Sequence, residues 1–306
     1  MSLNVTQVNQ IIPAISRDMA VKAIADSQTA KLLIANGSVQ AGVKGKASVL
    51  QLSQDVHLQD GSACGARNPL GTTSLGNTTI TVAQLKDEAN FCAKALYSTY
   101  YSYAIGKGQD PRSEGQLLAD FLRSILEVKS AEINLANEQL LWNGDTTISG
   151  TSNLKYINGI LKQLATAGTA VSLPATGSTI VEKLQNAHLA MPVEIRSKSD
   201  YRIFIGQDMY DAYTVALSLK NIYKPTEDYK LFGTTATLVP VTGLNGSNKV
   251  VATRLSNLLL GMDGDNESDN VLWNFSLETN SYYCDFHYAL GIVVIFPDQV
   301  GLGDFS

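Results

Sequence analysis

The sequence predicts an α+β fold built around one long helix. Three observations support this prediction. Apolar residues recur every three or four positions through 111–142, the period of a helix with one buried face. Apolar and polar residues alternate among frequent glycines in 36–82, which indicates paired strands. From 179 onward, capped helical segments and short apolar runs follow one another, and from 238 the runs are strand-like.

The composition limits what the chain can do. Its 306 residues carry 23 Lys and Arg against 28 Asp and Glu, for a net charge of −5. Domains that grip nucleic acid by its phosphates are usually basic, so we expect enclosure of nucleic acid at most, without tight binding. The apolar runs are far shorter than the ~18 residues of a membrane helix, and the N-terminus lacks a signal-peptide pattern. We therefore expect folding in a reducing cytosol and no membrane partner.

No pattern in the sequence indicates chemistry. The three cysteines are far apart and predict no disulfide framework, and the three histidines are isolated, as in ordinary surface or core positions. The sequence shows no phosphate-binding, dinucleotide-binding, nucleophile-elbow or zinc-ligand spacing. We therefore predict that the protein is not an enzyme, with no catalytic, cofactor-binding or metal-binding residues and no cofactor. The cysteines and histidines are Cys64, Cys92, Cys284, His57, His188 and His287.

An arm and a hairpin are predicted before the long helix. Residues 1–35 read as an N-terminal arm with weak helical character toward its end. In the glycine-rich segment 36–82, the alternating runs 49–58 and 78–82 predict a long β-hairpin. It has too few apolar residues to bury both faces, and an isolated two-stranded ribbon is marginal in water, so a neighbouring copy is its natural support. The apolar residues of the first run are Leu50, Leu52, Val56 and Leu58.

The long helix is the clearest element. Asp110 is a good N-cap, Pro111 suits the first helical position, and Asn143 with Gly144 supplies the stop. About 32 residues at ~1.5 Å each give roughly 48 Å, more than one compact domain needs. We expect the tyrosines of 83–110, which precede the helix, to pack in a core or an interface. The residues predicted to mark its solvent face are Glu127, Lys129, Glu132 and Glu138.

The second half of the chain alternates helices and strands. A capping box from Thr179 to Glu182 opens a helix that Pro192 ends, and Asp208 is expected to cap a helix to about 219. The residues predicted inside this last helix are Ala212, Val215, Ala216 and Leu219. The predicted strands are 201–205, 238–241, 248–252, 257–260, 271–277, 281–288 and 292–296.

One acidic segment bears on metal binding. Residues 263–269 place oxygen ligands at alternate positions, like the first half of a calcium loop. Ser268 stands where the loop needs glycine, and Asn274 where it needs glutamate. We therefore expect a solvated acidic turn between two strands.

The order of these parts resembles the major capsid protein of tailed bacteriophages, which has the Hong Kong 97 fold. Residues 80–96, ITVAQLKDEANFCAKAL, are similar to the return from that family's extended loop. Residues 139–159, QLLWNGDTTISGTSNLKYING, are similar to the end of its spine helix, and 203–213, IFIGQDMYDAY, to its axial strand and helix. GIVVIFPDQ resembles its closing strand. The resemblance covers nearly the whole chain.

The resemblance implies a division of the chain and a role. Subunits would build pentamers and hexamers of an icosahedral shell around double-stranded DNA in the virion, assembled in the host bacterial cytoplasm. Scaffolding, portal and decoration proteins would be partners, and DNA would be enclosed without sequence-specific binding. The implied parts are an N-arm at 1–35, an extended loop at 36–82 lying over an adjacent subunit, a peripheral domain at 83–145 and 266–288, and an axial domain at 146–265 and 289–306.

Other classes of protein remain as alternatives. An encapsulin, a bacterial nanocompartment shell, has the same fold and encloses cargo enzymes, so particle diameter and contents distinguish it. An enzyme would need a nucleophile, base and oxyanion site, and a tail or adhesion protein would be dominated by strands. Some shells join a hairpin lysine to an asparagine of another subunit. Lys44 and Lys46 lie on the hairpin, but nothing in the sequence indicates the buried lysine and carboxylate that this needs.

Overall fold

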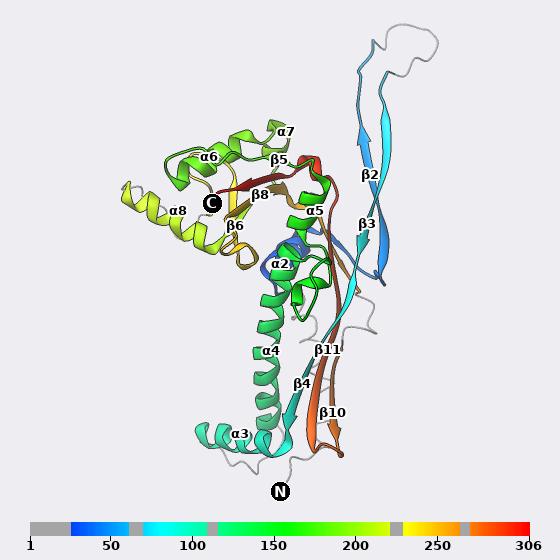
Figure 1. Cartoon of the computed structure of the whole chain (residues 1–306), viewed down its shortest axis with the longest axis vertical. Coiled ribbons are helices and arrows are strands. Elements are labelled where there is room, and N and C mark those ends of the chain that lie inside the picture. The colour runs from blue at the N-terminus through cyan, green and yellow to red at the C-terminus, as the bar shows by residue number, and fades with distance from the viewer. Residues whose placement is uncertain (1–25, 61–69, 109–115, 221–228, 264–269) are drawn as a thin grey trace.

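The computed structural model describes residues 26–60, 70–108, 116–220, 229–263 and 270–306. Figure 1 shows a long helix with a sheet beside it, a second sheet with helices around it, and a hairpin that projects from the body. This is the α+β architecture that the sequence predicts.

The first sheet lies beside the long helix. Its central strand β11 (Ser281–Val294) pairs antiparallel with β4 (Ala83–Cys92) along one edge. Along the other edge it pairs antiparallel with β9 (Leu258–Met262) and then β10 (Asn270–Ser276). Strand β1 (Val39–Gln40) adds to β9 in parallel.

The sequence divides β11 wrongly. It predicts separate strands at 281–288 and 292–296, but the pairing continues through Leu290 and Gly291. A Cβ at Gly291 would collide with the carbonyl oxygen of Thr81. Gly291, which lies between the two predicted strands, therefore allows another strand to approach closely, and β11 itself is not interrupted.

The predicted long helix is α4 (Gln116–Asn143), 28 residues or roughly 42 Å. Its expected caps Asp110 and Pro111 lie outside the described residues, and its predicted end at Asn143 is confirmed. Gly144 does not have the positive φ that glycine usually adopts at the C-terminal end of a helix. A Cβ there would lie 2.6 Å from the carbonyl oxygen of Leu140, so close packing is the reason for glycine.

Helices α3 (Ala93–Gly106) and α2 (Gln28–Asn36) pack against α4, one near each end. Helix α3 brings the ring of Tyr100 to 5.5 Å from that of Phe121, so the predicted packing of the tyrosines in a core is confirmed. Helix α2 is the described part of the predicted arm. The core of this half includes Leu33, Leu122, Leu126, Ile133, Leu140, Leu141, Trp142, Phe286 and Leu290.

The second sheet has the strand order β5-β12-β8-β6-β7 and its own core. Helices α6 (Ile180–Ala190) and α8 (Gln207–Leu219) pack beside each other. The predicted strands 201–205, 238–241 and 248–252 are confirmed as β6, β7 and β8. The strands are β5 (Val171–Ser172), β12 (Gly301–Asp304), β8 (Lys249–Arg254), β6 (Tyr201–Gly206) and β7 (Thr237–Val241). The remaining short elements are η1 (Asn153–Lys155), α5 (Ile160–Ala167), α7 (Val193–Arg196), η2 (Thr242–Leu244), η3 (Leu255–Asn257) and η4 (Pro297–Gln299).

The helix caps of this half follow the sequence in part. Thr179 caps α6 by accepting from the Glu182 backbone N–H at 3.4 Å, as predicted. The Glu182 carboxylate accepts from the backbone of Ser178 at 2.9 Å, one residue before the predicted partner. Asp208 is not the N-cap of α8, because Gly206 takes that position. Asp208 instead accepts from the Gly246 backbone N–H at 2.8 Å and ties α8 to the loop between η2 and β8.

Helix α8 turns a different face inward than the sequence predicts. Ala212, Val215, Ala216 and Leu219 were expected inside, yet Val215 is 59% exposed and Leu219 81% exposed. Two apolar stripes run along this helix, and the sheet covers the one with the larger side chains. Periodicity alone cannot tell which of two apolar stripes is covered. The buried stripe is Met209, Tyr213 and Leu217.

Candidate assembly surface

The predicted hairpin is present and projects beyond the body (Figure 1). Its strands are β2 (Lys46–Gln54) and β3 (Thr73–Thr81), each of 9 residues and paired antiparallel throughout. Strand β3 begins before the predicted run 78–82. The prediction missed its first residues, Thr, Ser, Leu, Gly and Asn, because they show no clear apolar alternation.

The base of the hairpin is fixed to its own body. Val43, Ile80 and Val82 are buried with Ala289 and Val293 of β11. The side-chain amide of Gln51 donates to the backbone carbonyl of Ile295 and, at 3.0 Å, to the Thr78 hydroxyl. The base therefore folds with the body, and only the part beyond it stands free.

The two faces of the hairpin differ in how far the body covers them. Leu52 and Leu75 are directly paired, and Leu50 lies on the same face one step nearer the base. Their exposed fractions are 55%, 69% and 69%. The opposite face, with Gln51 and Thr78, turns toward the chain's own body. We call Leu50, Leu52 and Leu75 the hairpin apolar face; it points away from the body that could have covered it. Val56, Leu58 and Leu70 are also exposed.

A buried carboxylate fixes helix α2 to the long helix. Glu138 is 1% exposed and accepts from the Thr29 backbone N–H at 2.9 Å. It also accepts from the Thr29 hydroxyl at 2.5 Å and the Trp142 indole N–H at 3.0 Å. Burial raises the pKa of the Glu138 carboxyl above its ordinary 4.5.

The prediction that Glu138 faces solvent is therefore wrong. Its spacing to Leu141 and Trp142, three and four residues on, places it on the apolar stripe of α4 and is the signal that identifies it. Lys129, also predicted on the solvent face, is partly covered through its ion pair with Asp87.

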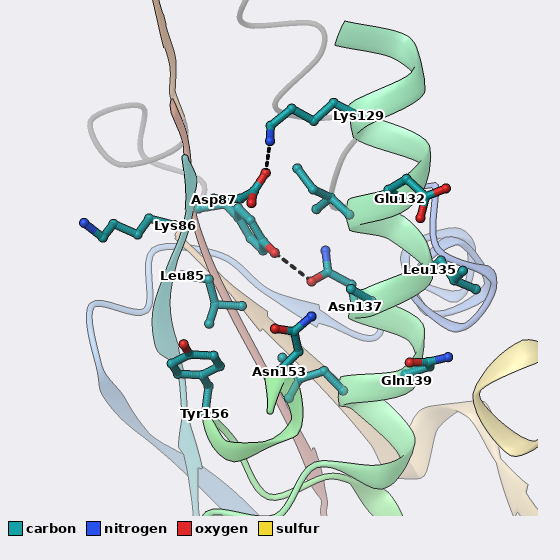
Figure 2. A pocket seen from close by; sticks show the side chains of 14 residues that line it. Leu85, Lys86, Asp87, Lys129, Glu132, Leu135, Asn137, Gln139, Asn153 and Tyr156 are labelled. Carbon is teal, nitrogen blue, oxygen red and sulfur yellow. Dashed lines mark hydrogen bonds and ion pairs between the residues drawn. The ribbon is translucent and has the colours of Figure 1, made fainter. Parts of the chain in front are cut away.

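A groove of about 560 Å³ lies between α4 and β4 (Figure 2). Lys129 of α4 pairs with Asp87 of β4 across it. The Tyr288 hydroxyl donates to the Asn137 side-chain oxygen at 2.9 Å. These pairs tie the sheet to the long helix. The apolar residues of the groove include Leu85, Ile133 and Leu140.

The candidate residues for chemistry do not come together. His57 is exposed, with its Nε2 atom 3.2 Å from Asp55, while His188 is buried and His287 lies in β11. Cys92 is exposed, and burial raises the pKa of the Cys284 thiol to about 12. Across the described ranges, no three His, Cys, Asp or Glu side chains gather into a possible metal site.

The remaining candidates are Cys64, the acidic segment and the two hairpin lysines. Cys64 and residues 264–269 of the acidic segment fall outside them. Strands β9 and β10 run the same way along one edge of β11, so the chain enters and leaves this segment without reversing direction. Lys44 and Lys46 are exposed.

Substituting His188 is expected to reduce sensitivity to acid. Its ring lies 5.7 Å from that of Tyr201, and burial, with a smaller contribution from Arg196, lowers the pKa of His188 below 6.5. The unfolded chain then takes up a proton that the folded chain does not, so stability falls as pH drops through 6.5. Melting at pH 7.5 and 5.5 should show a smaller loss for His188→Phe than for wild type. The exposed-site control His57→Gln should behave as wild type; an unchanged loss in His188→Phe would refute the assignment.

Comparison with known proteins identifies the fold. No family model and no curated protein sequence matches this chain. A chain of the satellite phage P4 procapsid, solved with its size determination (Sid) protein, matches with a TM-score of 0.64 and 13% identity, over 100% of this chain and 94% of that one. The capsid of an empty GTA particle matches with a TM-score of 0.58 and 13% identity, over 88% and 87%.

The same fold also occurs in a nanocompartment. The holo-SrpI encapsulin complex from Synechococcus elongatus matches with a TM-score of 0.50 and 12% identity, over 87% of this chain and 84% of that one. At such identities the likeness shows the fold, which is the Hong Kong 97 fold of phage capsid proteins. In the parts of the chain that the structure describes, no helix has the length and apolar character needed to span a membrane.

Proposed function

We propose that this protein is a structural subunit that self-assembles into pentamers and hexamers of an icosahedral capsid, enclosing the double-stranded DNA of a tailed phage. The observation that carries the proposal is the hairpin apolar face. Leu50, Leu52 and Leu75 extend away from the body that the described residues form. Burying such side chains against a neighbouring copy would be favourable by about 1.5–3 kcal/mol each. The fold shared with capsid chains supports the same role.

The parts of the chain take the following roles in this proposal. Residues 1–35 are the N-arm, and 36–82 are the extended loop that lies over a neighbouring subunit. The peripheral domain is 83–145 with 266–288, and the axial domain is 146–265 with 289–306. The net charge of −5 supports a wall that confines DNA without adhering to it, because like charges repel.

We also propose that the protein is not an enzyme. Two pairs of charged or polar groups form within the groove, Lys129 with Asp87 and Tyr288 with Asn137. Such pairs hold α4 against the sheet and are already occupied. We propose scaffolding, portal and decoration proteins as further partners, with assembly in the host bacterial cytoplasm and a final place in the virion.

An encapsulin-type shell is the second candidate, favoured by the encapsulin of the same fold. Negative-stain microscopy of the purified recombinant protein, and of particles from its native source, distinguishes the two. Capsid particles from the source would contain double-stranded DNA, measured by nuclease-protected absorbance at 260 nm. Small shells filled with protein cargo would favour the encapsulin, and a protein that stays monomeric at high concentration would contradict both.

Charging the hairpin apolar face is expected to abolish assembly without unfolding the subunit. In Leu52→Asp with Leu75→Asp, two carboxylates would face any partner surface and would also repel each other across the strands. Because both positions are exposed, the melting temperature of the subunit should stay within a few degrees of wild type. The matched control, Leu52→Ile with Leu75→Ile, keeps the face apolar and should form particles. Particles of normal yield from the Asp variant would contradict the role of this face.

A further inference from the structure

The outer stripe of helix α8 is apolar, and the described residues leave it exposed. Val215 and Leu219 are 59% and 81% exposed, and Ala212, three residues before Val215, is exposed with them. The opposite stripe of the same helix is buried in the second core. A helix that is apolar on two sides is typical of one buried on two sides. The chain itself covers one of them.

The charges of α8 frame this stripe. No charged residue occurs between Asp211 and Lys220, although the helix is at the surface. Asp208 and Asp211 lie at its N-terminal end, and Lys220 follows its C-terminal end. Lys220 reaches Glu182 only at 3.6 Å, with both side chains more than a third exposed. An uncharged apolar centre bordered by charges of both signs is the usual anatomy of a protein interface.

The position of α8 indicates what covers it. In Figure 1 the helix lies at the left margin of the molecule, and the hairpin lies at the right, across the long helix α4. Subunits that close into a ring contact each other through two different surfaces on opposite sides of each copy. The hairpin apolar face supplies one such surface, and the α8 stripe lies on the side where the other is needed.

We infer that Ala212, Val215 and Leu219 of α8 pack against a second copy of this chain, as an interface separate from the hairpin. The inference rests on the proposed self-assembly and adds a contact to it. The stripe was predicted from the sequence to be inside the protein. In this interpretation it is inside the assembly, with the neighbouring copy on its outer side.

Assembly and solvent labelling test the inference together. Val215→Asp with Leu219→Asp should give a folded subunit that forms few or no particles by negative stain and sedimentation. Val215→Ile with Leu219→Met keeps the stripe apolar and should assemble as wild type. Hydroxyl-radical labelling of Leu219, read by mass spectrometry, should fall at least several-fold in wild-type particles. The unassembled reference is Leu52→Asp with Leu75→Asp.

The outcomes separate this inference from the proposed function. If wild type forms particles and the Asp double variant does so equally, or if Leu219 is labelled equally in both states, the stripe is not an interface and the shell proposal stands. If wild type forms no particles, the shell proposal fails and the inference with it. Should the double variant misfold, Leu219→Asp alone gives the answer, since its side chain is 81% exposed.

Discussion

Replacing residues 48–79 by Asn-Gly is expected to leave a folded body that forms no closed particles. Ala47 and Ile80 are directly paired, so a two-residue turn joins them in a geometry that hairpins commonly use. The buried base, including Val43 and Val82, is kept. A deletion of 43–75 would remove Val43 and confuse loss of assembly with loss of stability.

The measurement is particle yield by sedimentation and microscopy, with thermal melting of the subunit alongside. We expect particle yield to fall to background, because every contact made by the projecting part is lost from each copy at once. Among the described residues that are removed, Val49 packs against the buried base and Gln51 donates to the carbonyl of Ile295, so melting should change by only a few degrees. Normal shells from this variant would show that the hairpin is dispensable and would remove the main support for the proposed function.

Removing the Glu138 carboxylate is expected to destabilise the subunit by about 3 kcal/mol. Glu138→Ala leaves the buried backbone N–H of Thr29 without its acceptor and opens a cavity beside Trp142. Urea unfolding measures the loss. Glu127→Ala, at an exposed position of the same helix, should stay within about 0.5 kcal/mol of wild type. Equal losses of unfolding free energy in the two variants would show that the buried carboxylate stabilises the subunit no more than an exposed one.

The same carboxylate predicts a dependence on pH. Because its pKa is raised by burial, folded Glu138 keeps a proton at pH values where the unfolded chain has lost it. Its contribution therefore weakens as pH rises above 4.5 and levels off above the raised pKa. Glu138→Gln cannot ionise and should remove this part of the slope. An identical slope in both proteins, measured by urea unfolding from pH 4 upward, would place the titration elsewhere.

The sequence predicted the elements whose signals are local. The stripe of α4, its end at Asn143 and the capping of α6 by Thr179 all depend on residues within a few positions of one another. The hairpin was predicted from alternation in 49–58 and 78–82, although residues 73–77 at the start of β3 carry none. These signals survive folding because they are set by backbone period and helix-end chemistry.

The misplaced features depend on contacts between distant parts of the chain. Glu138 is buried because Thr29, 109 residues earlier, supplies donors to it. Gly291 lets the backbone of Thr81 approach β11 closely. The residues next to Gly291 in the sequence do not indicate this contact. Which of the two apolar stripes of α8 is buried depends on how the helix packs against the second sheet. In the assembly surface, sequence named Leu50 and Leu52 but not their partner Leu75, which stands alone among polar residues.

The alternation of the two hairpin faces has a consequence for how such a protein can evolve. Ala47, Val49 and Gln51 turn toward the body, and Leu50 and Leu52 turn away, so inward and outward positions differ by a single residue. An insertion or deletion of one codon in β2 would exchange the two sets beyond that point. Substitutions between apolar residues can therefore adjust the outer leucines, whereas length changes in this strand are acceptable only in even numbers.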